Sequence, residues 1–282
     1  MAKRAICVGI NKFAKYPQFE LQGCVNDAKD MAAYCKKSLG FKASEVVLLT
    51  DAQATKAAIM KALKSAVADA KAGKLSAVVF SWSSHGTQKT DTSGDEPDGM
   101  DEAFVPHDIA EKAGDWDPAH VIVDDELHDL FQQLPDKVSL EVFLDTCHSG
   151  SGLRGAEFSL HAPRVKFIAP PGGCQGAVKQ KVVRGFALER STAAAEKPAT
   201  NQILWSGCKA NQTSADAYFK GRYNGAFTYY YLQAANGGAN GSGAKLTRNT
   251  IVQKMRAAMK GKFAQVPQLE TNATNRKTAV AN

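Results

Sequence analysis

The segment LEVFLDTCHSG (residues 140–150) joins a short apolar run to a cysteine and a glycine-containing turn. Four to eight apolar residues bounded by turn residues are typical of a fully buried strand, so the run predicts a strand over Leu140–Leu144. In a parallel sheet, ligands and reactive groups gather beyond the carboxyl ends of the strands. The sequence therefore predicts that Cys147 lies at such an end, followed by the turn at Gly150.

A second segment, AVVFSWSSHG (residues 77–86), has the same design. It predicts a strand over Ala77–Trp82 that delivers His85 and then Gly86. If the two strands are parallel neighbours, the thiol of Cys147 and the imidazole of His85 lie within reach of each other. The alternative is a buried structural cysteine and a histidine satisfied within the core.

Strands and helices alternate along most of the rest of the chain, which predicts an α/β fold with a mostly parallel central sheet flanked by helices on both faces. Asn26-Asp27 and Thr55 are expected to cap the first two helices. The expected strands cover 4–10, 46–49 and 202–205, and the expected helices cover 26–39, 56–72, 124–134, 226–235 and 247–260. We expect a large part (1–154), a flexible connection (155–201) and a small part (202–282) that completes the same domain.

Composition places the chain among ordinary globular proteins, with 282 residues, of which 44% are hydrophobic and 22% charged. The formal charge of +7 is spread out, and the basic stretch 245–278 lacks interleaved aromatic residues, so no nucleic-acid partner is expected. The six cysteines form no CxxC pair, which argues against a closed zinc site. No run reaches the roughly 18 apolar residues of a membrane span and no secretory leader is recognised, so we expect a cytoplasmic protein without a membrane partner.

The chemistry that suits Cys147 and His85 is nucleophilic catalysis. A thiol becomes a strong nucleophile as a thiolate, and a nearby imidazole can take its proton and return it to a leaving amine. Backbone N–H groups near Gly86 and Cys147 could then stabilise an oxyanion. His148 is a poor candidate for the base, because immediate neighbours on an extended segment point to opposite faces.

Together with further short segments, these motifs resemble the metacaspase (orthocaspase) branch of the caspase-like cysteine peptidases over residues 4–235. The matching segments are VGIN (8–11), LQGCVNDA (21–28), SSHGTQ (83–88), GDEPDGMDE (94–102), DDEL (124–127), DTCHSGSG (145–152), SGC (206–208) and QTSADA (212–217). The resemblance implies the three-layer caspase-like fold. The chain lacks the Gln-Ala-Cys-x-Gly signature of animal caspases, and with it the expectation of cleavage after Asp.

The resemblance implies cleavage of polypeptides after Arg or Lys, with Cys147 as nucleophile and His85 as general base. It also implies that Asp27 and Asp145 line the pocket for the cationic side chain, with Cys24 and Ser83 beside it. Two carboxylates in a poorly solvated pocket repel each other, and an incoming cation relieves that repulsion. Asp216 either adds to the pocket rim or caps a local turn.

Six acidic residues crowd the stretch 91–102, but an EF-hand is not expected, because Glu96 stands where that motif requires glycine. The resemblance implies instead that Asp101, Asp124 and Asp125 are calcium ligands, with calcium as an activator and no cofactor needed for the chemistry itself. Arg154 would oppose cation binding near the fourth ligand position. The alternative is a solvated acidic loop, with Asp124-Asp125 capping a helix.

The resemblance also implies self-processing within 155–201, where Arg184, Arg190 and Lys181 are candidate sites and the Arg184–Gly185 bond is favoured. Further basic residues in this segment are Arg164, Lys166, Lys179 and Lys197. A monomer is expected. Two alternatives stay open: a catalytically silent binding or scaffold protein with the same fold, and another thiol enzyme such as an acyltransferase.

Overall fold

A six-stranded sheet forms the centre of the computed structural model, which describes residues 1–92, 94, 99–147, 163–172, 201–209, 212–236 and 246–280. The strand order is β14-β11-β9-β3-β1-β2, and all neighbours are parallel except β14, which pairs antiparallel with β11. The bounds are β1 Ala2–Gly9, β2 Val46–Thr50, β3 Leu75–Ser83, β9 Ser139–Asp145, β11 Gln202–Ser206 and β14 Gln268–Glu270. The predicted mostly parallel sheet is confirmed.

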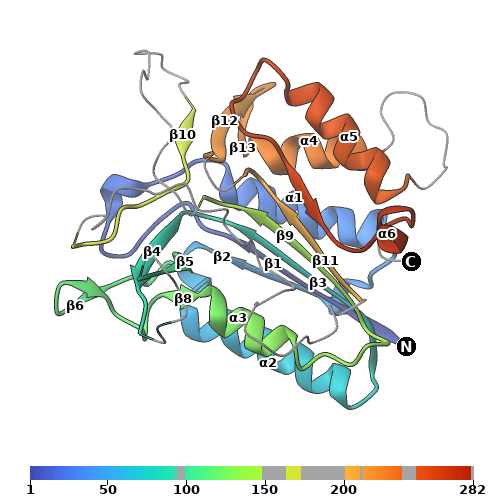
Figure 1. Cartoon of the computed structure of the whole chain (residues 1–282), viewed down its shortest axis with the longest axis horizontal. Coiled ribbons are helices and arrows are strands. Elements are labelled where there is room, and N and C mark those ends of the chain that lie inside the picture. The colour runs from blue at the N-terminus through green and yellow to red at the C-terminus, as the bar shows by residue number, and fades with distance from the viewer. Residues whose placement is uncertain are drawn as a thin grey trace.

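Helices cover both faces of this sheet (Figure 1). One layer contains α1 (Cys24–Lys37), α4 (Ala226–Ala235) and α5 (Arg248–Met259), and the other contains α2 (Lys56–Lys71) and α3 (Asp124–Phe131). Each face has its own apolar core, since side chains alternate along the strands. The predicted three-layer α/β architecture is thus confirmed.

Helix α1 begins two residues earlier than expected: it starts at Cys24 after Gly23, so Asn26 and Asp27 lie in its first turn and do not cap it. The reason is that their side chains bond to a more distant part of the chain. Asn26 Nδ2 donates to the carbonyl of Tyr223 at 2.7 Å. The expected cap at the second helix is confirmed, because Thr55 accepts a hydrogen bond from the third residue of α2.

Helix α3 ends at Phe131, short of the expected residue 134, because the chain tightens there into turns: Gln133 and Leu134 donate to the carbonyls of Leu130 and Phe131, three residues back. Strand β5 (Met100–Phe104) includes Asp101 and Glu102 of the acidic stretch. The smaller strands are β4 Gly86–Thr90, β5 Met100–Phe104, β6 Glu111–Lys112, β7 Asp115–Trp116, β8 Ile122–Val123, β10 Arg164–Val165, β12 Ala215–Phe219 and β13 Arg222–Gly225. The short helices are η1 Pro17–Phe19, η2 Ala43–Glu45, η3 Asp51–Gln53 and α6 Ala273–Arg276.

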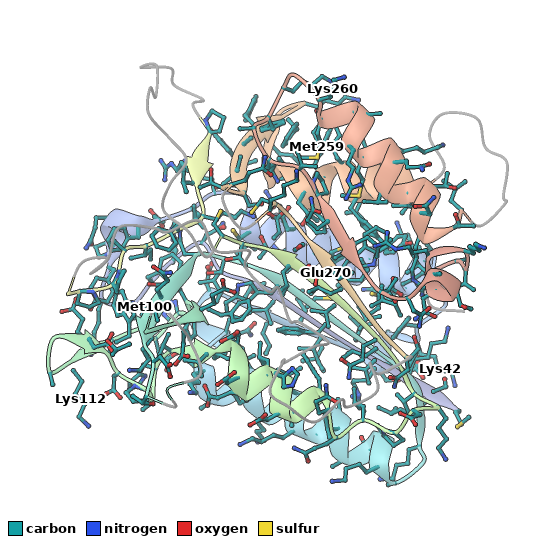
Figure 2. The ribbon with its side chains drawn as sticks, in the orientation of Figure 1. Lys42, Met100, Lys112, Met259, Lys260 and Glu270 are labelled. Atoms are coloured by element: carbon teal, nitrogen blue, oxygen red, sulfur yellow. The ribbon has the colours of Figure 1, made fainter. Side chains whose placement is uncertain are left out.

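Side chains fill the space between each helical layer and the sheet (Figure 2). The end of α5 illustrates the division, since Met259 is buried and Lys260 is exposed. Lys112, on the β6–β7 hairpin, points outward into solvent (Figure 2). Among the described residues, no helix combines the length and the apolar character that a membrane crossing requires.

Candidate active site

The ends of β3 and β9 bring the two reactive segments together. These strands are parallel neighbours, and Ser83 lies opposite Asp145 in their register. Two residues further along each segment stand His85 and Cys147. The loops touch directly at Gly86, where an added Cβ would lie 1.8 Å from the Cys147 carbonyl oxygen. Only glycine permits this approach of the two backbones.

The imidazole of His85 is buried and held in one orientation. Its Nε2 lies 2.8 Å from the Phe19 carbonyl oxygen, which can only accept, so Nε2 carries the proton in the neutral ring. Nδ1 then carries the lone pair, and within the described residues it has no hydrogen-bond partner. Burial lowers the pKa of His85 to about 4. The hydrogen bond to Phe19 opposes this shift, and the charges of Lys166 and Arg164 add to it. The ring is therefore a neutral base at physiological pH.

The thiol of Cys147 is fully buried. It donates to the Ser214 carbonyl oxygen at 3.4 Å and accepts a hydrogen bond from the Ser214 backbone N–H. Cys208 lies beside it, with its thiol 3.8 Å from the Thr146 carbonyl oxygen. A hydrogen bond with Cys147, together with burial, raises the pKa of the Cys208 thiol. The Ser214 backbone and Cys208 thus hold the thiol, and Nδ1 of His85 makes no hydrogen bond to it.

Beside the thiol, a buried acidic pocket is built from α1, β3, β9 and the end of β13. Asp27 accepts from Ser83 Oγ at 2.7 Å, from Asn224 Nδ2 at 2.9 Å and from the backbone N–H of Gly225. Asp145 Oδ1 accepts from Ser214 Oγ at 2.8 Å, and its Oδ2 accepts from the N–H and hydroxyl groups of Thr228 at 3.0 and 2.8 Å. Each carboxylate is therefore fixed in place by neutral donors. One oxygen of each carboxylate, Asp27 Oδ2 and Asp145 Oδ1, also faces a cation.

Lys166 supplies that cation. Its fully buried Nζ lies 2.9 Å from Ser83 Oγ, 3.0 Å from Asp145 Oδ1 and 3.4 Å from Asp27 Oδ2, and it also donates to the Asp145 carbonyl at 3.2 Å. Burial alone would lower the pKa of Lys166, but the surrounding negative groups, Asp145 foremost, raise it well above its ordinary value. Residue 225 lines the pocket and must be glycine, since a Cβ at this position would lie 2.3 Å from Nζ of Lys166.

The carbonyl of the same lysine lies at the reactive centre. Lys166 O accepts from the Gly86 N–H at 2.9 Å and from the Cys147 N–H at 3.3 Å. These are the two donors that the sequence predicts for an oxyanion. Two N–H groups aimed at one carbonyl oxygen next to a thiol form an arrangement that can stabilise a tetrahedral oxyanion.

The remaining pocket candidates lie nearby. Cys24 is buried, and burial, partly offset by the charge of Lys166, raises its pKa. Asp216 Oδ2 accepts from the Gln22 N–H at 2.7 Å, immediately before α1. Burial raises the pKa of Asp216, with Lys166 as the largest opposing influence. Asp216 therefore neither caps its own turn nor touches the ammonium, but it adds negative charge behind the pocket.

The expected metal ligands are placed on β5, for Asp101, and in the first turn of α3, for Asp124 and Asp125. In the described part of the chain, they do not belong to any group of three or more His, Cys, Asp or Glu side chains able to hold a metal ion. These residues alone do not make a calcium cage. The self-processing candidates Arg184, Arg190 and Lys181, and also Arg154, lie outside the described residues.

Sequence reasoning did not find several contributors to the site, among them Asn224 and Thr228, whose side chains bond to Asp27 and Asp145. Phe19 acts through its backbone carbonyl, which leaves no trace in residue identity. Ser214 acts through its backbone groups and also through its hydroxyl, which donates to Asp145. Gly225 acts through its backbone N–H and through the absence of a side chain. The sequence presents Lys166 only as one basic residue among several in 155–201. A signal existed, because RVKFI (164–168) is a short apolar-and-basic run inside a segment otherwise rich in proline, glycine and polar residues.

These features define a caspase-like protein with a thiol, an imidazole and an acidic pocket at the carboxyl end of a parallel sheet. A family model described as "Metacaspase, peptidase C14 domain" matches residues 3–155. Metacaspase-1A of Aspergillus clavatus is 33% identical over 95% of this chain, and the chain spans 65% of that relative's length. Metacaspase-1 of Ajellomyces capsulatus is 31% identical, with 95% of this chain and 79% of the relative covered. The chain belongs to the metacaspase family of cysteine peptidases.

Solved structures share the fold of this chain. A Geobacter sulfurreducens protein of known crystal structure is 25% identical, with a TM-score of 0.66 over 100% of this chain and 99% of that one. Caspase-1 from Spodoptera frugiperda is 13% identical, with a TM-score of 0.55 over 95% of this chain and 86% of that one. This second likeness shows the fold alone, and the predicted caspase-like fold is confirmed.

Proposed function

We propose that the chain is an endopeptidase that hydrolyses peptide bonds after Lys or Arg, with Cys147 as nucleophile and His85 as base. One observation carries the proposal. The Lys166 ammonium lies between Asp27 and Asp145, and the carbonyl of the same residue accepts the two N–H groups beside the thiol. A peptide with a cationic side chain in this pocket thereby presents its own carbonyl to the nucleophile.

In the proposed reaction, the Cys147 thiol leaves its contacts with Ser214 and transfers its proton to Nδ1 of His85. The sulfur attacks the carbonyl carbon, and the N–H groups of Gly86 and Cys147 hold the negative oxygen. In comparable sites, removing one such donor raises the activation free energy by about 3–4 kcal/mol. The Phe19 carbonyl keeps the ring in the tautomer that leaves Nδ1 basic. His85 then protonates the leaving amine, and water hydrolyses the thioester.

The pocket suits Lys and Arg for an electrostatic reason. Asp27 and Asp145 are both about 1% exposed, and burial, together with the charge of Asp145, raises the pKa of Asp27 to about 7 even with the opposing Lys166 in place. An uncharged side chain would leave two buried carboxylates without a cation, which is unfavourable. A guanidinium can pair with both, since its planar fork offers several donors.

We further propose that no cofactor takes part in the chemistry, that calcium acts at most as an activator, and that the protein is a cytoplasmic monomer acting on polypeptides. The proposed steps use only side chains and backbone groups of this chain. Because the described carboxylates alone do not form a calcium cage, no step is assigned to calcium. Activity assays with added calcium and with a chelator test this point directly.

The test of the proposed function is hydrolysis of fluorogenic peptides that differ only in the residue before the cut bond: Lys, Arg, norleucine or Asp. We expect cleavage after Lys and Arg and none in Cys147→Ala, with the fold of that variant verified by circular dichroism. Equal cleavage of the norleucine peptide would refute the proposed specificity. Inactivity of the wild type on all four peptides, with and without calcium, would favour the silent binding protein.

A further inference from the structure

The segment around Lys166 is bound along its whole length as an extended strand. On one side of Lys166, β10 pairs antiparallel with β12, and the Lys166 N–H donates to the Ser214 carbonyl at 3.2 Å (Figure 1). On the other side, Phe167 forms a parallel bridge with Gly86, and the Ile168 N–H donates to the Gly86 carbonyl at 2.9 Å. The Lys166–Phe167 peptide bond is therefore held by backbone hydrogen bonds on both sides.

Side chains fix the position of the same strand. Arg164 stands two residues before Lys166, and its guanidinium donates to the Glu20 carbonyl. Lys166 fills the acidic pocket. Ile168 is 1% exposed and belongs to the apolar core that lies under α2 and α3. Three anchors at alternate residues match the period of an extended chain, so the bond is centred on the thiol and cannot slide by one residue.

We propose that Arg164–Ile168 is a built-in substrate that blocks the site, and that the Lys166–Phe167 bond is where the chain first cuts itself. This inference rests on the proposed function, and it replaces Arg184–Gly185 as the favoured processing bond. The carbonyl of Lys166 already accepts hydrogen bonds from the two N–H groups that would stabilise the oxyanion. A substrate from outside must displace this strand, which fills both the pocket and the backbone sites.

The step balances as one peptide bond hydrolysed for one water consumed. The Cys147 sulfur bonds to the Lys166 carbonyl carbon while its proton passes to His85. The bond to the Phe167 nitrogen then breaks, and that nitrogen takes the proton and leaves as an amine. Water, deprotonated by His85, attacks the thioester, so that Lys166 ends in a carboxylate and the thiol is restored.

The cut separates the pocket anchor from the core anchor. Before it, the buried Ile168 holds Lys166 close to the site, and this tether gives the blocking strand a high effective concentration. Afterwards, Lys166 is the end of a chain attached only through Arg164, and Ile168 no longer restrains it. Cleavage of an external peptide should therefore begin slowly and accelerate as the chain is cut.

Intact-mass measurement of the purified full chain over time tests the inference. Wild type and Lys166→Arg should yield fragments 1–166 and 167–282, with a first-order rate constant that does not depend on protein concentration, because the strand is internal. Cys147→Ala should stay whole. Lys166→Met, which keeps the stem and removes the charge, should cut at this bond at least about 100-fold more slowly, because the pocket carboxylates lose their cation. Lys112→Met, at an exposed site, should match wild type.

The outcomes separate this inference from the proposed function, because each preparation is also assayed on the fluorogenic lysine peptide. Activity on that peptide with the chain intact at 166, or with a first cut at 184, overturns the inference and leaves the proposed function standing. Absence of both activities overturns both. A cut at 166 in Cys147→Ala, or an apparent first-order rate constant that rises in proportion to protein concentration, also contradicts an internal substrate acting on its own site.

Discussion

Replacing Asp145 by asparagine tests the pocket most sharply, because Asp145 Oδ1 makes the shortest carboxylate contact with the bound ammonium, at 3.0 Å. Asparagine can keep an oxygen toward Thr228, but its amide nitrogen then faces the ammonium. Removing one partner of a buried ion pair costs about 3–5 kcal/mol. Asp27 at 3.4 Å still offsets part of this loss, so we expect the lower end of that range. At 1.4 kcal/mol per factor of ten, this is a fall of roughly 100-fold or more in kcat/KM for lysine peptides.

The assay compares lysine and norleucine peptides on wild type and Asp145→Asn, so that general damage to the site cancels. On preparations cut to the same extent at residue 166, the lysine peptide should lose roughly 100-fold and the norleucine peptide less than about threefold, since only the first carries the charge. Asp69→Asn on α2, which removes a carboxylate paired with Arg4 and Lys74, is the matched control and should leave both peptides unaffected. Equal losses for the two peptides would refute the role of the Asp145 charge.

Three further changes have definite expected outcomes. Gly86→Ala should abolish peptide cleavage, because its methyl group would overlap a backbone oxygen, whereas Gly172→Ala, whose methyl meets only an oxygen at 3.5 Å, should retain activity. Burial raises the pKa of Asp27 to about 7, so protonation below that pH removes its negative charge. The KM for lysine peptides should therefore rise as the pH falls from 8 to 6, and a KM that does not change with pH contradicts this. Arg248→Met should lower the free energy of unfolding in urea by about 3–5 kcal/mol, because it leaves Glu141 buried without its bidentate partner, bonded at 2.9 and 3.0 Å; a loss below about 1 kcal/mol would contradict it.

The sequence predicts the sheet and the meeting of the two loops because the signals are local. The apolar runs before His85 and Cys147 have the length typical of buried strands. Their parallel pairing follows from the helix that lies between them in the chain. Asp27 is harder to place, since a residue near a helix start has a local explanation as a cap. Its position in the pocket depends on Asn224 and Gly225, about 200 residues away.

The occupant of the pocket could not be chosen from the sequence. Each basic residue in 155–201 satisfies the charge requirement equally well, and Gly185 after Arg184 offered only an argument about space. What selects Lys166 is the combination of three contacts at alternate residues, with Ile168 in a core whose other members come from distant elements. Such a match depends on tertiary packing, which no window of sequence contains.

The most direct test of the central claim is covalent labelling of the wild-type chain with a peptidyl-lysine chloromethyl ketone, followed by peptide mapping by mass spectrometry. The account predicts one label, on the Cys147 sulfur, with labelling slowed by free lysine peptides and strongly reduced in Asp145→Asn. Loss of activity with the label on Cys24, Cys208 or any residue other than Cys147 would contradict it.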